Sequence, residues 1–242
     1  MLKRCLLFLF ILISVTAHAQ WKEDTLTLFD EARQRMIPVS ISLPSGQKEY
    51  KAVVLFSHGY NENRPGSYLD YTYLKRYLTN HGYAVVSIQH ELPGDSLLSS
   101  TSPVKVARMP NWQRGAANIL YVIRHLQDVN PQLITKPCII MGHSNGGDMS
   151  ALFATLHPEY CRQLITLDNR RMTLPLSNEV KVATIRSSDQ PADEGVLPED
   201  EEKRKFGVLV LKAESVIHNH MSDAGSPEER REILELLSKI LD

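Results

Sequence analysis

The chain has 242 residues, of which 43% are hydrophobic and 23% are charged, and its formal net charge is -1. This composition is ordinary for a globular enzyme, and the length suits a single α/β domain. The near-neutral charge, without a basic stripe along the chain, argues against nucleic acid as a partner.

The N-terminal residues have the layout of a secretory signal peptide. Two basic residues precede an almost unbroken apolar run over residues 5–15, and residues 17–19 read Ala-His-Ala, a small-x-small cleavage site. The apolar run is too short to span a bilayer comfortably. We therefore predict a signal peptide over residues 1–19 and a catalytic domain over residues 20–242. The protein would be exported, periplasmic or secreted, with no stable membrane insertion after cleavage.

Apolar runs alternate with helical patterns along the rest of the chain, which is typical of βαβ units. The pattern predicts an α/β fold whose mostly parallel sheet has about eight strands and helices on both faces. Residues 91–110 read as a long irregular loop beside the ligand site. The expected strands are 25–29, 37–43, 52–56, 83–88, 137–141, 164–167, 180–185 and 208–211, the first two forming an antiparallel pair. The expected helices are 68–78, 111–127, 148–156 and 227–241, with 198–205 as a charged helix or loop.

Two cysteines, Cys138 and Cys161, remain after the predicted cleavage. An exported protein can oxidise such a pair to a disulfide. Each cysteine also adjoins a predicted buried strand, so two buried thiols are the preferred interpretation. Neither has the spacing of a metal site, and the sequence implies no metal or organic cofactor.

Residues 142–146 (Gly-His-Ser-Asn-Gly) match the G-x-S-x-G nucleophile elbow. The glycines allow a strand and a helix to approach closely around a strained serine. A predicted strand precedes the motif and a predicted helix follows it, which is the context that the motif requires. Ser144 is therefore the predicted nucleophile.

These residues, together with Ser57-His58-Gly59 and with acidic and histidine loops later in the chain, resemble the α/β-hydrolase superfamily. The chain is most similar to small members of the dienelactone hydrolase and platelet-activating-factor acetylhydrolase type, and the interval between residues 167 and 180 is too short for a large cap. The resemblance implies an oxyanion hole formed by the backbone N–H groups of Asn145 and Tyr60. It also implies that His58 buttresses its loop. His143 is expected to pack or hydrogen-bond behind Ser144.

A serine hydroxyl needs a neighbouring base, and in this fold the base comes late in the chain. His218 is the preferred candidate because it is nearer than His220 to the last strand. His220 would then lie outside the catalytic contacts. His157, before a proline, is expected to cap a helix end. A metal site made by the two later histidines would lack a third ligand at a defined spacing.

Three aspartates are candidates for the acid that orients the base. Asp189 is preferred because it follows the strand 180–185 by a short loop, which is close to the usual position in this fold. Asp193 would serve if the loop were longer. Asp168 ends the preceding strand, a position that some lipases use. Any aspartate outside the site would be a loop-capping residue.

The predicted function is that of an exported serine hydrolase, with a carboxylesterase that acts on a small-molecule ester through an acyl-enzyme as the preferred interpretation. Alternatives on the same fold are a serine peptidase or amidase and an acyltransferase. A different class, an inactive hydrolase-fold binding protein, is also open. Arg170 and Arg171 adjoin the expected site, where they would bind an anionic substrate group or form solvated or paired surface charges.

Overall fold

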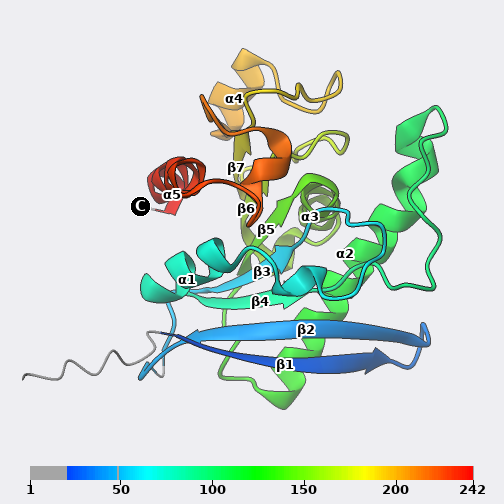
Figure 1. Cartoon of the computed structure of the whole chain (residues 1–242), viewed down its shortest axis with the longest axis vertical. Helices are drawn as coiled ribbons and strands as arrows, with labels where there is room; N and C mark the ends of the chain where they lie inside the picture. Colours follow the sequence, from blue (N-terminus) through cyan, green and yellow to red (C-terminus); the bar gives the residue numbers. More distant parts are fainter. Residues whose placement is uncertain (1–20, 48, 242) are drawn as a thin grey trace, which may run out of the picture.

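The computed structural model describes residues 21–47 and 49–241, so the predicted signal peptide lies outside the described residues. One eight-stranded sheet crosses the molecule in the order β1-β2-β4-β3-β5-β6-β7-β8 (Figure 1). β2 pairs antiparallel with β1 and β4, and the remaining neighbours are parallel. The strands are β1 Trp21–Asp30, β2 Arg35–Pro44, β3 Val53–Ser57, β4 Ala84–Ile88, β5 Cys138–His143, β6 Cys161–Leu167, β7 Lys181–Arg186 and β8 Leu209–Lys212.

The central strands are buried on both faces, which explains why they read as continuous apolar runs rather than alternating ones. In β3, Val53 and Leu55 join the hydrophobic core on one side of the sheet, whereas Val54 and Phe56 join the core on the other side. This division follows from the two-residue period of side chains along a strand. The expected α/β architecture is confirmed.

Helices cover both faces of the sheet. α2 (Val104–Val129) and α3 (Ser144–Leu156) contribute to one core, and α1 (Thr72–Asn80) and α5 (Pro227–Leu241) contribute to the other. α4 (Asp200–Phe206) is the charged segment that the sequence left open, and a capping box between Glu199 and Glu202 starts it as a helix. Short 3-10 turns occupy Ser67–Leu69, Pro158–Tyr160 and His218–Met221.

α2 begins earlier than its sequence indicates. The expected loop 91–110 ends at Pro103, and Pro110 lies inside the helix. A proline within a helix removes a hydrogen bond to the carbonyl four residues earlier, here that of Val106. The side chain of Val106 is 70% exposed, so water can reach this turn and hydrate the freed carbonyl. The helix therefore continues through a residue that would normally end it.

Cys138 and Cys161 are neighbours across β5 and β6, and both are free, buried thiols. Burial raises the pKa of each thiol to about 12. The preferred interpretation of the two cysteines is thus confirmed. No helix within the described residues is long and apolar enough to cross a bilayer.

Candidate active site

The nucleophile elbow forms as the motif predicts. β5 ends at His143 and α3 begins at Ser144, whose φ of 52° lies in the left-handed region. Such a backbone costs energy in a non-glycine residue and is found where the surrounding structure holds it in place. The turn leaves the Ser144 side chain at the carboxyl edge of the sheet, where ligands bind in parallel α/β folds.

The glycines of the elbow are required by close backbone contacts. A Cβ atom added at Gly146 would lie 2.3 Å from the carbonyl oxygens of Ser57 and His58, and one at Gly142 would lie 2.4 Å from the oxygen of Gly146. These distances are far below any van der Waals contact. The elbow therefore packs directly against the end of β3, which carries the expected oxyanion loop.

His218 lies beside the predicted nucleophile. Its Nε2 atom is 2.9 Å from the hydroxyl oxygen of Ser144. Its Nδ1 atom is 2.5 Å from Oδ2 of Asp168, a carboxylate that is fully buried at the end of β6. A carboxylate accepts hydrogen bonds only, so Nδ1 carries the proton and Nε2 is free to accept one from the serine. Ser144, His218 and Asp168 form a continuous hydrogen-bonded chain.

The preference for Asp189 as the acid is corrected by this geometry. Oδ1 of Asp189 accepts a hydrogen bond from the backbone N–H of His218 at 2.7 Å, not from the imidazole ring. Asp189 is exposed, whereas Asp168 is buried, follows β6 directly and contacts the imidazole ring. Asp193 is also away from the ring and faces Arg171 at 3.9 Å. Asp168, the least favoured of the three in the sequence, is the ring's partner.

The surroundings of Asp168 keep it ionised. Burial alone would raise the pKa of this carboxyl, but the hydrogen bond from His218, the charge of Arg186 and the bonds from Ser187 outweigh burial and lower the pKa below its usual value. Arg186 lies 2.8 Å from Oδ1, and the hydroxyl of Ser187 donates to Oδ2 at 2.7 Å. A charged carboxylate at this position can hold the proton on Nδ1 and stabilise an imidazolium formed when the ring takes the serine proton.

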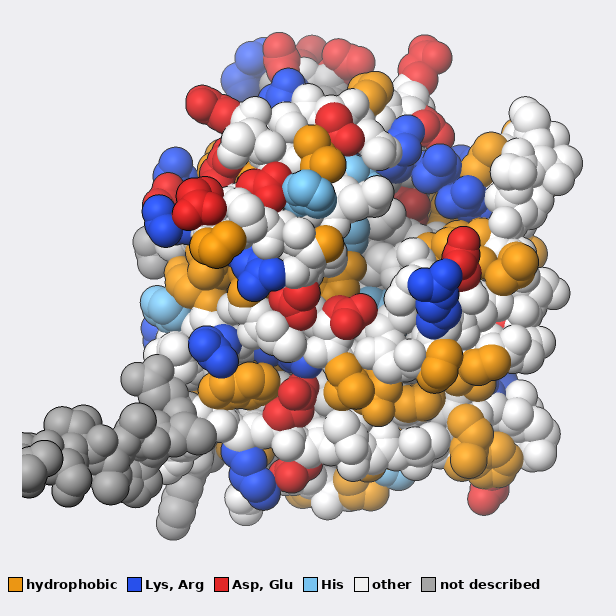
Figure 2. Space-filling model, viewed as in Figure 1, with side chains coloured by type: hydrophobic (Ala, Val, Ile, Leu, Met, Phe, Trp, Pro, Cys, Tyr) orange, Lys and Arg blue, Asp and Glu red, His pale blue; other side chains and the backbone are white. Residues whose placement is uncertain are grey.

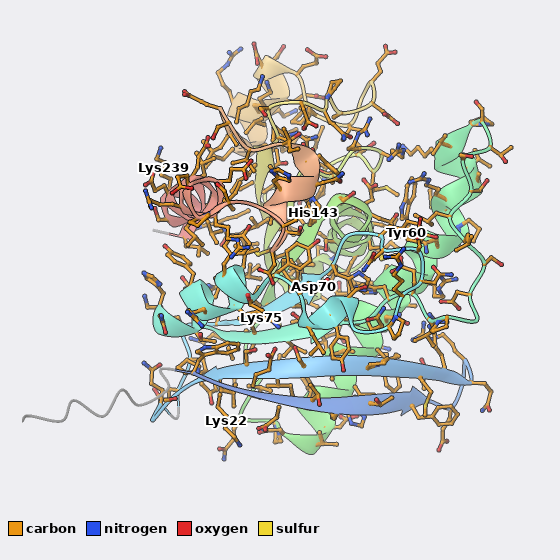
Figure 3. The ribbon with its side chains drawn as sticks, in the orientation of Figure 1. Lys22, Tyr60, Asp70, Lys75, His143 and Lys239 are labelled. Atoms are coloured by element: carbon orange, nitrogen blue, oxygen red, sulfur yellow. The ribbon has the colours of Figure 1, made fainter. Side chains whose placement is uncertain are left out.

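A cavity of about 310 Å³ opens onto Ser144 and His218. Figure 3 labels three of its lining residues, Tyr60, Asp70 and His143, which come from separate segments of the chain. Asn145 follows Ser144 in the first turn of α3, where backbone N–H groups have no partner within the helix. The full lining comprises Gly59, Tyr60, Asn61, Asp70, Tyr71, His143, Ser144, His218, Asn219, Ser222 and Ala224.

Buried hydrogen-bond partners hold the side chain of Asn145 in place. The sequence analysis did not predict these partners. Its Oδ1 accepts from the indole N–H of Trp112 at 2.8 Å, and its Nδ2 donates to Oε1 of Glu91 at 3.0 Å and to Oδ1 of Asn111 at 2.9 Å. All four residues are buried. No local sequence pattern indicates these contacts, because the residues come from α2, α3 and the segment after β4 and meet only in the folded chain.

A second buried network joins the two sides of the cavity. The backbone N–H of Gly59 donates to the hydroxyl of Tyr71 at 3.0 Å, and that hydroxyl is 2.8 Å from Nδ1 of His143. Nε2 of His143 is 3.0 Å from the carbonyl oxygen of His218. A carbonyl only accepts, so Nε2 carries the proton and Nδ1 accepts from Tyr71. His143 thus hydrogen-bonds to the backbone of His218 and supports the loop that carries it, as expected.

Removing the hydroxyl of Tyr71 is expected to disturb both ends of this network. In Tyr71→Phe, Gly59 N–H and His143 Nδ1 each lose a buried partner, so the oxyanion loop and the His218 loop become less well positioned. We expect kcat to fall roughly 10- to 100-fold, with KM little changed. Tyr121→Phe removes a hydroxyl that bonds to Phe29 far from the site and serves as the control. An unchanged kcat in Tyr71→Phe would show that the network has no positioning role.

Burial of His143 predicts an acid-sensitive fold. Burial, together with the charge of His218, lowers the pKa of His143 to about 3. Below the ordinary value of about 6.5, the unfolded chain therefore binds a proton that the folded chain rejects. His143 therefore does not lower the free energy of unfolding above about pH 6.5. Between about pH 6.5 and pH 3, protonation of the unfolded chain lowers that free energy by up to about 1.4 kcal/mol per pH unit.

Urea denaturation between pH 4 and 8 checks this expectation. His143→Gln should flatten the acid limb of the stability curve, because glutamine does not titrate. The exposed His81 is the matched control, and His81→Gln should leave the acid limb as it is. An equally steep limb in His143→Gln would assign the acid sensitivity to other groups.

The remaining histidines near the site are held in structural contacts. His58 has Nδ1 2.7 Å from the carbonyl of Gly59, and its Nε2 accepts from the N–H of His90 at 3.1 Å, so it buttresses the loop as expected. His220 pairs with Glu229 at 2.8 Å and does not contact Ser144. Within the described residues, no cluster of three or more His, Cys, Asp or Glu could hold a metal ion.

Residues 48–167 match the family model described as serine aminopeptidase, S33. The matched segment contains the Ser57-His58-Gly59 loop and the whole nucleophile elbow. It ends one residue before Asp168, so Asp168 and His218 lie beyond it.

Solved structures share the fold over nearly the whole chain. A dienelactone hydrolase-like promiscuous phosphotriesterase from metagenomic libraries has a TM-score of 0.64 at 14% identity, covering 91% of this chain and 99% of that one. A ferulic acid esterase also has a TM-score of 0.64, at 13% identity, covering 92% and 96%. An acylaminoacyl peptidase has a TM-score of 0.62 at 18% identity, covering 92% of this chain and 41% of that one.

The fold, the family match and the nucleophile elbow define a serine hydrolase. The chain has the α/β-hydrolase fold, and it resembles dienelactone hydrolase-like members in architecture. Residues 168–180, between β6 and β7, contain no helix, which agrees with the expected lack of a large cap at this position.

Proposed function

We propose that this protein is an exported carboxylesterase that hydrolyses small esters through an acyl-enzyme on Ser144. The observation that carries the proposal is the hydrogen-bonded chain from Ser144 through His218 to the buried Asp168, at 2.9 Å and 2.5 Å. Such a chain activates a serine hydroxyl, which is otherwise a weak nucleophile at neutral pH.

In the proposed reaction, Nε2 of His218 takes the proton of Ser144 while the serine oxygen attacks the ester carbonyl. The backbone N–H groups of Asn145 and Tyr60 stabilise the oxyanion, with the N-terminus of α3 adding a favourable dipole. Asp168 holds the proton on Nδ1 and stabilises the imidazolium. His218 then protonates the leaving alcohol. Water, deprotonated by the same histidine, attacks the acyl-enzyme and releases the acid.

The size of the cavity favours short acyl groups. At about 310 Å³ and with mostly polar lining residues, it suits a small ester better than a long fatty acyl chain. We expect the mature protein to hydrolyse p-nitrophenyl acetate and butyrate faster than the octanoate. We also expect a fluorophosphonate probe to label Ser144, as located by peptide mapping. Absence of both turnover and labelling would contradict the esterase and favour an inactive binding protein.

Amide hydrolysis is the second candidate, because the matching family model is described as a serine aminopeptidase. The same catalytic chain can cleave an amide if the leaving amine is protonated by His218. Parallel assays with p-nitroanilides of single amino acids separate the two activities. Esterase turnover without anilide turnover supports the proposed function, and efficient anilide turnover would replace it with a peptidase.

Export is proposed from the N-terminal sequence alone. Expression with an intact N-terminus in a Gram-negative host, followed by N-terminal sequencing of the periplasmic protein, provides the test. Cleavage after Ala19 supports export, whereas recovery of the uncleaved chain from the cytoplasm contradicts it.

A further inference from the structure

Two consecutive buried residues just after β4, His90 and Glu91, take no part in the proposed triad. The side chain of Glu91 is 1% exposed, and that of His90 is fully buried. Histidine covers little of the molecular face that Figure 2 shows, in keeping with the burial of His58 and His90. Both residues of this pair contact segments that carry the proposed oxyanion donors.

The side chain of Glu91 reaches the residue that follows the nucleophile. Its Oε1 accepts hydrogen bonds from Nδ2 of Asn145 at 3.0 Å and from Nδ2 of Asn111 at 3.3 Å. Nδ2 of Asn145 also donates to Oδ1 of Asn111 at 2.9 Å, and Oδ1 of Asn145 accepts from the indole of Trp112 at 2.8 Å. Both amide hydrogens and the amide oxygen of Asn145 are thus engaged, which holds this side chain in one orientation.

A fixed side chain also fixes the backbone of Asn145. This residue directly follows the left-handed turn at Ser144, and its N–H is one of the two proposed oxyanion donors. An oxyanion donor acts only if it is aimed at the developing charge, and a misplacement of about 1 Å can cost roughly 100-fold in rate. The anchor of the Asn145 side chain therefore bears on the rate of the reaction.

His90 supports the second proposed donor through His58. The backbone N–H of His90 donates to Nε2 of His58 at 3.1 Å, so Nδ1 of that ring carries the proton and donates to the carbonyl of Gly59 at 2.7 Å. This carbonyl and the N–H of Tyr60 belong to one planar peptide group, so holding the oxygen also holds the direction of the N–H. Nε2 of His90 is 2.9 Å from the hydroxyl oxygen of Ser57, at the end of β3.

The placement of Glu91 is costly for the fold. Its Oε2 is buried and makes no hydrogen bond within the part of the chain that the structure describes. Nε2 of His58 lies 3.7 Å from Oε2, but the lone pair of that nitrogen already accepts from His90. A buried carboxylate with an unsatisfied oxygen destabilises a fold, and an apolar side chain of similar volume is often more favourable. This cost points to a role of Glu91 in the geometry of the site rather than in stability.

We propose that Glu91 is a positioning residue of the oxyanion hole. It fixes one donor through the side chain of Asn145, while the adjacent His90 fixes the other through His58. Glu91 is not among the described residues that line the cavity, so it acts on the donors and not on the substrate itself. This inference rests on the proposed function. It predicts that loss of Glu91 lowers kcat and leaves KM little changed.

An ester and its thionoester with the same leaving group measure the oxyanion hole separately from the rest of the site. In p-nitrophenyl acetate the developing negative charge is on oxygen, whereas in O-4-nitrophenyl thionoacetate it is on sulfur, a weak hydrogen-bond acceptor. We expect the wild type to prefer the oxygen ester by roughly 100-fold in kcat. A smaller folded fraction, or a displaced His218, would slow both substrates equally and leave this ratio unchanged.

Glu91→Ala should lower kcat for the oxygen ester by roughly 10- to 100-fold and for the thionoester by less than about threefold. Glu91→Gln keeps an oxygen that can accept from Asn145, so the ratio should remain within about threefold of the wild type. Trp112→Phe keeps an aromatic ring but removes the N–H that donates to Asn145, and it should reduce the ratio in the same direction. Trp112→Phe decides the outcome if thermal denaturation shows that Glu91→Ala is unfolded.

Asp30→Ala is the matched control. Asp30 is also a buried carboxylate, but it pairs with Arg33 at the end of β1, the outermost strand of the sheet. Its loss should lower stability and leave the ratio unchanged. Equal loss of both substrates in Glu91→Ala, or the same change of ratio in Asp30→Ala, would overturn the inference while leaving the esterase intact. If the wild type cleaves neither substrate, the proposed function fails, and this inference fails with it.

Discussion

Replacing Ser144 by alanine is expected to lower kcat for p-nitrophenyl esters by about a million-fold. In the proposed mechanism the hydroxyl oxygen forms the acyl-enzyme, and it lies 2.9 Å from Nε2 of His218. The residual rate should reflect only the oxyanion N–H groups and substrate binding. Stopped and continuous assays of p-nitrophenol release measure this loss directly.

Ser222 provides a matched control for the nucleophile. It lines the same cavity, but its hydroxyl donates to the carbonyl of Asn219 and does not contact the imidazole ring. Ser222→Ala should keep near-normal turnover and fluorophosphonate labelling. Substantial turnover in Ser144→Ala, or loss of labelling in Ser222→Ala alone, would contradict the assignment of the nucleophile.

Asp168→Asn is expected to lower kcat by about a thousand- to ten-thousand-fold. An amide cannot stabilise the imidazolium that forms when His218 takes the serine proton, and it can favour the wrong tautomer of the ring. Because Asp168 also pairs with the buried Arg186, the variant should lose some stability. Thermal denaturation monitored by circular dichroism will show whether the variant is folded at the assay temperature.

Asp189→Asn separates the two aspartates near the base. Asparagine keeps a carbonyl oxygen that can accept the backbone N–H of His218, and the exposed position tolerates the change. We therefore expect a fall in kcat of less than about 10-fold. If Asp189→Asn lost as much activity as Asp168→Asn, the hydrogen-bonding partner of the ring in this structure would not be the catalytic acid.

The first turns of α2 were predicted as part of a loop, but they are helical. Pro110 and the surrounding polar residues predicted a loop, because local patterns treat proline as a helix boundary. The turn at Val106 is exposed, so its freed carbonyl is open to hydration, and the buried face from Trp112 onwards joins the hydrophobic core and holds the helix in place. Burial of that face outweighs the local preference of proline to end a helix. The amount of burial depends on what the helix contacts, and only the tertiary structure shows these contacts.

The sequence by itself determined the α/β fold, Ser144 and the loop that carries His218. These features depend on short-range patterns, namely buried strand runs and a strand–turn–helix motif with obligatory glycines. Only the tertiary structure decided which aspartate contacts the imidazole ring. Asp168 and Asp189 both follow parallel strands that are neighbours in the sheet, so their spacing in the chain cannot distinguish them. The choice depends on which carboxylate reaches Nδ1 of His218, and that depends on the paths of two loops around a buried ring.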